Sequence, residues 1–288
     1  MDNKSKAIWL MVLSSLSFAL MGAVVKFAGD LPLFMRIFSR DFVVVMFAVL
    51  MLSTQKTSPF GNPGNRAHLL IRGISGFIGV IFFFYSTTYL HLSDSTILNK
   101  LSPFFTTLFC VLLLREKLPK IQIPALILSL LGALLVIKPQ FSLSLLPALS
   151  GLMGAIIAGF SYTMVISLSG KEHPLVVVFY FSCTSALCSF FIMLFDLQMP
   201  TNMQFVYLFL IGLFATGGQV FLTYSYKYAK ASDISIYSYA TIVFAGVIGY
   251  FIWKEIPDVY SWIGTLLIVF ASTLVYISNH HKRKKSEG

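Results

Sequence analysis

The residues of this chain best able to do chemistry are basic side chains that interrupt long apolar segments. Arg36 and Arg40 stand four positions apart in one segment, so a helix would place them on the same face. Lys100 lies inside another segment. If these segments cross a membrane, a charged group within them is costly and is a functional candidate by default. We therefore predict that Arg40 and Lys100 offer positive charge to a carboxylate or phosphate of a solute.

A structural role is the alternative for these basic residues. Lys26 and Arg36 lie near the ends of their apolar segments, so we expect their charged groups to extend to the lipid headgroups. For Arg40 the alternative is an ion pair with Asp41 or Asp94. The sequence leaves solute binding and ion pairing both open for this residue.

The surroundings of Lys100 predict a break in its helix. Pro103 lacks a backbone N–H and crowds the carbonyl of Asn99, so a helix here should kink. The kink would leave a backbone acceptor beside Asn99 and Lys100 for a ligand or water. A kink that serves packing alone is the alternative.

Polar aromatic residues form a second group of candidates. Tyr85 and Tyr224 occupy matching positions in the two halves of the chain, Gln219 lies in the same segment as Tyr224, and Tyr162 and Tyr239 lie in other apolar segments. Amphipathic rings around a cavity suit a solute with an apolar body and polar ends. Tyrosines of membrane proteins also serve at interfaces and in packing, and that alternative stays open for each of them.

Motifs for catalysis are absent from the sequence. The chain has no P-loop, HExxH or GxSxG motif, so we expect neither direct ATP hydrolysis nor another enzymatic activity. Cys110, Cys183 and Cys188 all lie within apolar segments and lack the spacing of a metal or disulfide site. We predict no metal site and no cofactor.

The composition indicates an all-α polytopic membrane protein. Hydrophobic residues make up 57% of the chain and charged residues 11%, far below the quarter or so typical of soluble domains. The net charge of +10 does not indicate nucleic-acid binding, because the charges lie in short loops and at the ends of apolar segments. We expect the basic tail 282–285 to contact anionic lipid on the cytoplasmic side.

Ten apolar segments are close to the length of about 20 residues that a membrane-spanning helix needs. Pro, Gly and Asp residues separate them, as at Asp30-Leu31-Pro32 and Lys138-Pro139. The predicted spans are 7–28, 33–53, 67–90, 95–114, 121–137, 147–169, 174–194, 203–226, 234–253 and 259–278.

The distribution of basic residues predicts the orientation. With the N-terminus in the cytoplasm, fifteen Lys and Arg residues fall on the inner side and three, Lys26, Lys138 and Lys254, on the outer side. Such a bias is typical of cytoplasmic loops. We predict a protein of the cytoplasmic (inner) membrane with both termini inside. The fifteen are Lys4, Lys6, Lys56, Arg66, Arg72, Arg115, Lys117, Lys120, Lys171, Lys227, Lys230, Lys282, Arg283, Lys284 and Lys285.

The two halves of the chain repeat each other. Residues 73–137 match residues 212–276 at a constant offset of 139 positions, which pairs Glu116 with Glu255 without a gap. Five spans in each copy would place the copies upside down relative to each other, as in many alternating-access transporters. The predicted division is a first repeat at 1–140, a second repeat at 141–279 and a basic cytoplasmic tail at 280–288.

The chain resembles the drug/metabolite transporter superfamily, specifically its EamA-type ten-helix permeases. The resemblance covers nearly the whole length and includes Ser93-Asp94 at the start of the fourth span, where we expect a helix cap. Leu114-Arg115-Glu116-Lys117 ends that span, and Trp253-Lys254-Glu255 repeats the pattern. The resemblance implies a secondary transporter with a central cavity between the two halves.

These observations predict a permease that moves a small organic metabolite by alternating access. An amino acid or a related zwitterionic or anionic amphiphile fits the charge of Arg40 and Lys100 and the tyrosines. A channel or a non-transporting membrane scaffold is the alternative. The expected partners are the solute and membrane lipids, without nucleic acid. Substrate identity, direction, ion coupling, and the choice between monomer and homodimer stay open.

Overall fold

Every regular element in the described part of the chain is a helix, which confirms the all-α prediction. The computed structural model describes residues 3–29, 31–115, 121–137, 145–229 and 234–287. The α-helices are α1 (Asn3–Phe27), α2 (Leu33–Thr54), α3 (Arg66–Tyr89), α4 (Leu92–Asn99), α5 (Ser102–Leu114), α6 (Gln122–Ile137), α7 (Leu145–Leu168), α8 (Pro174–Met193), α9 (Asn202–Tyr228), α11 (Ala240–Trp253) and α12 (Val259–Glu287). Short 3-10 helices are η1 (Pro63–Asn65), η2 (Leu194–Asp196) and η3 (Ser235–Tyr239).

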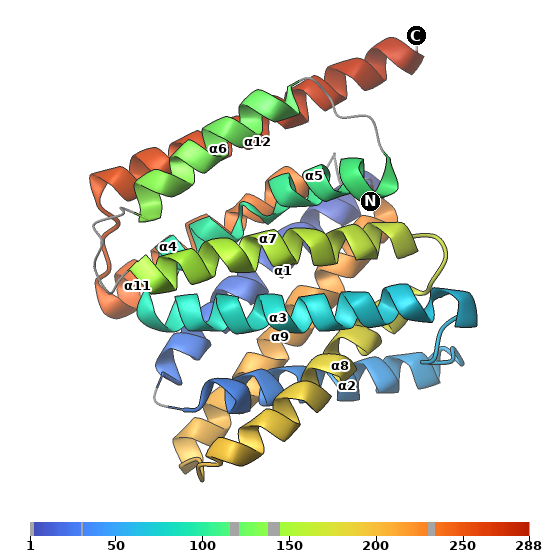
Figure 1. The fold of residues 1–288 in the computed structure, drawn as a ribbon, viewed down its shortest axis with the longest axis vertical. Helices are drawn as coiled ribbons and strands as arrows, with labels where there is room; N and C mark the ends of the chain where they lie inside the picture. The colour runs from blue at the N-terminus through green and yellow to red at the C-terminus, as the bar shows by residue number, and fades with distance from the viewer. Residues whose placement is uncertain (1–2, 30, 116–120, 138–144, 230–233, 288) are drawn as a thin grey trace.

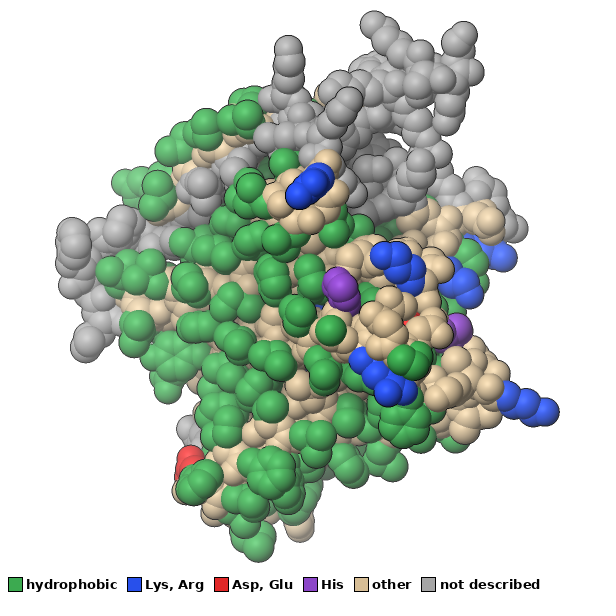
Figure 2. All heavy atoms as spheres, turned by 45° about the vertical axis from the view of Figure 1, so that its right-hand side comes forward, with side chains coloured by type: hydrophobic (Ala, Val, Ile, Leu, Met, Phe, Trp, Pro, Cys, Tyr) green, Lys and Arg blue, Asp and Glu red, His purple; other side chains and the backbone are tan. Residues whose placement is uncertain are grey.

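The outer surface of the bundle is apolar over much of its height. Large hydrophobic side chains such as Leu112 and Phe251 are more than half exposed, and Figure 2 shows them covering the visible flank. Seven helices within the described residues are long and apolar enough to cross a membrane, and Tyr237–Trp253 and Val259–Ala271 form shorter apolar helices. An exposed apolar surface of this extent needs lipid rather than water around it.

The helices pack in pairs that come from opposite halves of the chain. α1 packs on α9, and α3 packs on α7. α6 and α12 lie side by side at one edge of the bundle, while α2 and α8 form the opposite edge (Figure 1). Residues of the two halves therefore meet in the centre of the bundle.

In each half of the chain, a helix is interrupted near the middle of the bundle. α4 ends at Asn99 and α5 begins at Ser102, directly before Pro103, which is tolerated in the first turn of a helix. The break agrees with the predicted kink. The second half has a matching break: η3 ends at Tyr239 and α11 begins at Ala240, which lies 139 positions after Leu101. Because no proline stands there, a proline is not required for this break.

Other details of the helix ends correct the sequence predictions. The N-cap residue of α4 is His91 and makes no side-chain capping hydrogen bond, so Ser93-Asp94 is not the cap but part of the first turn. Ser232-Asp233 and Glu116-Lys117 lie outside the described residues. The last span was expected to end at 278, but α12 continues to Glu287 and includes most of the basic tail.

Candidate functional site

A cavity of about 1080 Å³ lies between the helices of the two halves. Its lining comes mainly from α1, α3, α5, α7 and α9, together with residues at the breaks before α5 and α11. Six of the eight predicted binding residues line it: Arg40, Asn99, Lys100, Tyr162, Gln219 and Tyr239.

The two remaining candidates are not among the residues that line the cavity. The ring of Tyr85 packs against Tyr89 with centroids 4.9 Å apart. Tyr224 packs on an apolar cluster that includes Leu168, and the ammonium of Lys227 lies 5.7 Å from the centre of its ring. The matching positions of Tyr85 and Tyr224 in the repeat therefore do not indicate that these residues line the cavity.

Arg40 forms the ion pair with Asp41 that was one of the two alternatives, and it also lines the cavity. Only 2% of its surface is exposed, and its Nη1 donates a hydrogen bond of 2.5 Å to Oδ1 of Asp41. Ser185 donates to the other oxygen of the same carboxylate. Arg40 also lines the cavity, with its guanidinium 5.1 Å from the centre of the Phe181 ring. The ion pair therefore holds the arginine at the cavity wall.

Arg72 is a cavity residue that the sequence analysis assigned to the inner surface instead. It lies in the second turn of α3, is 4% exposed, and donates from Nη1 to Oγ of Ser161 at 2.9 Å. Its guanidinium stacks 4.2 Å from the centre of the Phe181 ring and 6.0 Å from that of Tyr162. Arg72 is the sixth residue of the predicted span 67–90. This position within an apolar segment is the feature of the sequence that indicates a buried side chain.

A small residue allows this stacking. A Cβ atom at Gly76, one turn after Arg72, would lie 2.6 Å from the ring of Phe181, which is too close for a real contact. Glycine at this position lets α8 approach α3 and brings the ring under the guanidinium. This glycine thus also shapes the cavity wall.

Lys100 lies in the break between α4 and α5 with Asn99 beside it. Its backbone carbonyl accepts a 3.2 Å hydrogen bond from the hydroxyl of Tyr239. These two residues are 139 positions apart, so they are a matched pair of the sequence repeat. No described side chain forms a hydrogen bond or ion pair with the Lys100 ammonium, which belongs to the cavity lining.

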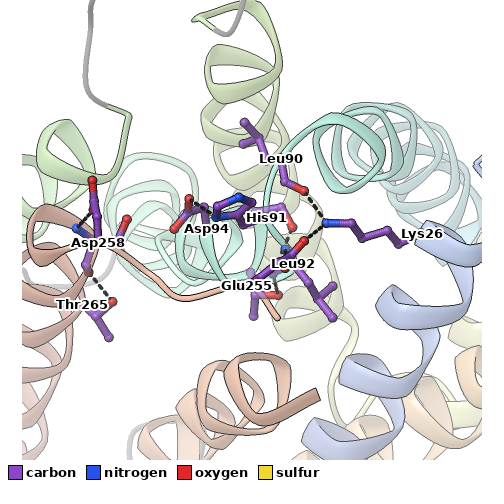
Figure 3. A network of polar contacts seen from close by, with 11 residues as sticks. Lys26, Leu90, His91, Leu92, Asp94, Glu255, Asp258 and Thr265 are labelled. Atoms are coloured by element: carbon purple, nitrogen blue, oxygen red, sulfur yellow. Dashed lines mark hydrogen bonds and ion pairs between the residues drawn. The ribbon is translucent and has the colours of Figure 1, made fainter. Parts of the chain in front are cut away.

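A polar network closes one end of the bundle, shown in Figure 3. Lys26 of α1 forms an ion pair with Glu255, which follows α11, and donates to the carbonyl of Leu90 at 3.2 Å. Glu255 also accepts the backbone N–H of Leu92 at 3.1 Å, at the start of α4. None of these four residues lines the cavity. We call this set the closing network.

The expected extension of Lys26 and Arg36 to the headgroups is wrong. Lys26 takes part in the closing network, and its ammonium lies 5.3 Å from the centre of the Trp253 ring. Arg36 is 3% exposed and donates from Nη1 to the carbonyl of Val25 and to Oγ1 of Thr88. Both cations are instead held by acceptors within the protein.

The other end of the bundle holds the mouth of the cavity, where Gly170, Glu172 and Lys227 belong to the lining. The carboxylate of Glu172 accepts hydrogen bonds from the backbone of Asn62 at 2.9 Å and from the Asn65 side chain at 2.8 Å. It therefore ties the α2–α3 connection to the start of α8. Gly170 and Lys227 are exposed to solvent.

His173 caps α8 near this mouth. Its Nδ1 accepts the backbone N–H of Leu175 at 3.3 Å. Burial, helped by the nearby Lys227 charge, lowers the pKa of His173. The imidazole is therefore neutral at pH 7, which is the state that can accept this hydrogen bond.

A bundle whose described elements are all helices, with an apolar flank and a central cavity that contains a few charged and polar side chains, defines a multi-pass membrane protein. The model of the EamA-like transporter family matches residues 5–138 and 145–277, so this chain belongs to that family. The resemblance drawn from the sequence is thereby confirmed.

Similar proteins extend across almost the whole chain. The pseudopaline exporter CntI of Pseudomonas aeruginosa is 32% identical over 274 residues, which cover 94% of this chain and 96% of the exporter. Solute carrier family 35 member G1 of Homo sapiens is 24% identical over 247 residues, or 80% of this chain and 68% of that protein. A solved crystal structure with 17% identity and a TM-score of 0.70 covers 95% of this chain and shares its fold.

Proposed function

We propose that this chain is a secondary transporter that carries a small organic solute across the cytoplasmic membrane by alternating access. The observation that supports this best is that Arg40 of α2, Arg72 of α3 and Lys100 at the break between α4 and α5 all line one cavity. Charged groups at such depth are costly unless they meet a partner. A solute with an acidic group supplies that partner.

The proposed solute is an amino acid or a related zwitterionic or anionic amphiphile. Arg40 and Lys100 offer positive charge to the acidic groups of the solute, and Asn99 and Gln219 offer hydrogen bonds to its polar groups. Tyr162 and Tyr239 provide aromatic surface for an apolar body. Tyr85 and Tyr224 are not part of this site, because they do not line the cavity.

The proposed mechanism depends on two inverted repeats of five spans each, at 1–140 and 141–279, followed by the tail 280–288. The helix pairs support this arrangement, since α1 on α9 is the counterpart of α7 on α3 under exchange of the halves. The backbone also supports it. Arg115 and Lys254, 139 positions apart, both end their helices in the left-handed conformation, with φ of 55° and 56°.

The proposed orientation has both termini in the cytoplasm. Exposed basic residues support this: Lys227 lines the mouth, Lys171 precedes Glu172, and Arg66 follows Asn65, which binds Glu172. Figure 2 shows Lys and Arg side chains gathered toward one side of the visible face. The cavity then opens to the cytoplasm, and the closing network lies on the outer side. The name of the Pseudomonas relative, a pseudopaline exporter, favours export as the direction.

The proposal is tested with purified protein. A thermal-shift screen of amino acids and other small carboxylates should find a solute that raises the melting temperature in a concentration-dependent way. Labelled solute should then enter proteoliposomes with saturable kinetics and with counterflow. Flux that does not saturate would indicate a channel, and the lack of any ligand or flux would indicate a scaffold.

Variants test the site and the orientation separately. Arg40→Ala and Lys100→Ala should raise KM at least about tenfold, because each removes a charge-assisted hydrogen bond. Lys171→Ala, at an exposed position, is the control. Unchanged transport in both cavity variants would refute the site. Cysteines placed at Lys227 and His91 should react with an impermeant reagent from opposite sides of the membrane, and reaction from the same side would refute the inverted repeat.

A further inference from the structure

We infer that the transported solute carries two acidic groups, which bind at two separate basic sites in the cavity. The arginine site is formed by Arg40 and Arg72, and the lysine site is formed by Lys100 and Asn99. This inference rests on the proposed transport function and specifies its substrate class.

The charges of the cavity wall require more than one anionic group. Lys227 and Glu172 at the mouth carry opposite charges, and of the three remaining cations of the lining, Arg40, Arg72 and Lys100, Asp41 neutralises Arg40 through their ion pair. Arg72 donates to the hydroxyl of Ser161, and Lys100 has no anionic neighbour among the described residues. An excess of two positive charges therefore faces the cavity. Because the cost of burying a cation is recovered only by a close counter-charge, a dianion matches this wall better than a monoanion.

The arginine site has the geometry of a carboxylate site. Both guanidinium groups stack on the ring of Phe181, with centroid distances of 5.1 Å for Arg40 and 4.2 Å for Arg72. Their buried Nε atoms have no hydrogen-bond partner in the described part of the chain. A guanidinium presents paired N–H donors that fit the two oxygens of a carboxylate. Unused donors on two neighbouring arginines therefore suit one acidic group.

The lysine site stands apart from the arginine site. Lys100 lies at the break between α4 and α5 and is linked through its carbonyl to Tyr239 of the other half. Arg40 of α2 and Arg72 of α3 share the ring of Phe181 in α8, whereas Lys100 stands at the junction of α4 and α5. Because the two sites are built from different helices, one acidic group of the solute is assigned to each.

The experiment compares linear dicarboxylates from succinate to suberate with their monoamides, which have the same length and one charge less. Binding to the purified full-length protein is measured by isothermal titration calorimetry. At the best chain length, the dicarboxylate should bind at least about tenfold more tightly than its monoamide, since the second group forms a charge-assisted hydrogen bond.

Variants assign this preference to the two sites. Lys100→Gln and Arg72→Gln should each reduce the preference to less than about twofold. Lys100→Arg keeps the positive charge and should retain the preference for the dicarboxylate. The exposed control Lys171→Gln should retain this preference as well. Melting curves establish that each variant is folded. If Arg72→Gln does not fold, the comparison of Lys100→Gln with Lys100→Arg decides whether the preference for the dicarboxylate depends on the positive charge at position 100.

The inference and the proposed function fail in different ways. Equal affinity for dicarboxylate and monoamide, or an intact preference in Lys100→Gln, would overturn the inference. So would a screen in which only monocarboxylates or zwitterions bind and are transported, although the transport function would then stand. Absence of any saturable flux would overturn the transport function itself.

Discussion

Two of the ion pairs among the described residues connect the chain in opposite ways. Lys26 and Glu255 come from opposite halves of the sequence and add two backbone partners from the α3–α4 connection. Arg40 and Asp41 are neighbours in the sequence, and their pair is almost fully buried beside the cavity. The first pair joins separate helices, and the second holds a charge in position within one helix.

This difference indicates what each pair does. Breaking the Lys26 pair should release α1, α4 and the end of α11 from one another, which affects conformation more than stability. Breaking the Arg40 pair should leave a buried charge without its partner, which affects stability more than conformation. The predictions below separate these two effects.

The largest effect is expected for Asp41→Ala. This variant leaves Arg40 without a counter-charge and should lower the free energy of unfolding by about 3 kcal/mol. Thermal or denaturant unfolding of purified protein in detergent measures the change. Ser185→Ala removes only one hydrogen bond to the carboxylate and should cost about 1 kcal/mol. Wild-type stability in Asp41→Ala would show that the pair is not needed to hold the arginine.

A smaller effect on stability is expected at the closing network. Because Lys26 and Glu255 are only partly shielded, a double-mutant cycle of Lys26→Met and Glu255→Gln should give a coupling energy of about 1 kcal/mol. The exposed carboxylate Asp196, changed to Asn, is the matched control. A coupling energy of zero would show that Lys26 and Glu255 do not stabilise each other in the closing network.

The same variants should change access to the cavity. In a background without Cys110, Cys183 and Cys188, a cysteine at buried Met21 reports access from the closed end. Lys26→Met should increase its reaction with an impermeant maleimide added to intact cells. If Asp41→Ala increased this reaction as much as Lys26→Met, the proposed division between the two pairs would be wrong.

Pro103→Ala should change the free energy of unfolding by less than about 1 kcal/mol. Proline in the first turn of α5 removes no helical hydrogen bond, and the matching break before α11 forms without a proline. The solute identified in the thermal-shift screen should bind this variant with wild-type affinity. A large loss of affinity would mean that Pro103 itself sets the position of Lys100.

The smallest effects are expected for Tyr85→Phe and Tyr224→Phe, which should leave solute affinity unchanged. Tyr162→Phe, within the cavity, should weaken binding by roughly fivefold if its hydroxyl donates one hydrogen bond to the solute. Titration of the screened solute measures all three. Weakened binding in Tyr224→Phe would show that the cavity extends beyond its present lining.

Segment composition predicted the helices well, because an apolar run of membrane length has few alternatives to a helix. Contacts between distant helices were harder to predict. The sequence identified Arg40 and Lys100 as cavity candidates but assigned Arg72 to the surface, since its charge was counted and its depth in α3 was not. The hydrogen bond from the backbone N–H of Leu92 to Glu255 could not be predicted from the sequence, because it depends on the relative positions of α4 and α11.

The hydrogen bond between Tyr239 and Lys100 limits how alike the two halves can become. Positions related by the duplication touch each other here, so whatever side chain occupies one must tolerate its counterpart at close range. The contact joins the Tyr239 hydroxyl to the backbone carbonyl of Lys100, so a change at position 239 alters the surroundings of the break that carries Lys100. The second copy of the repeat thereby supports the charged residue of the first.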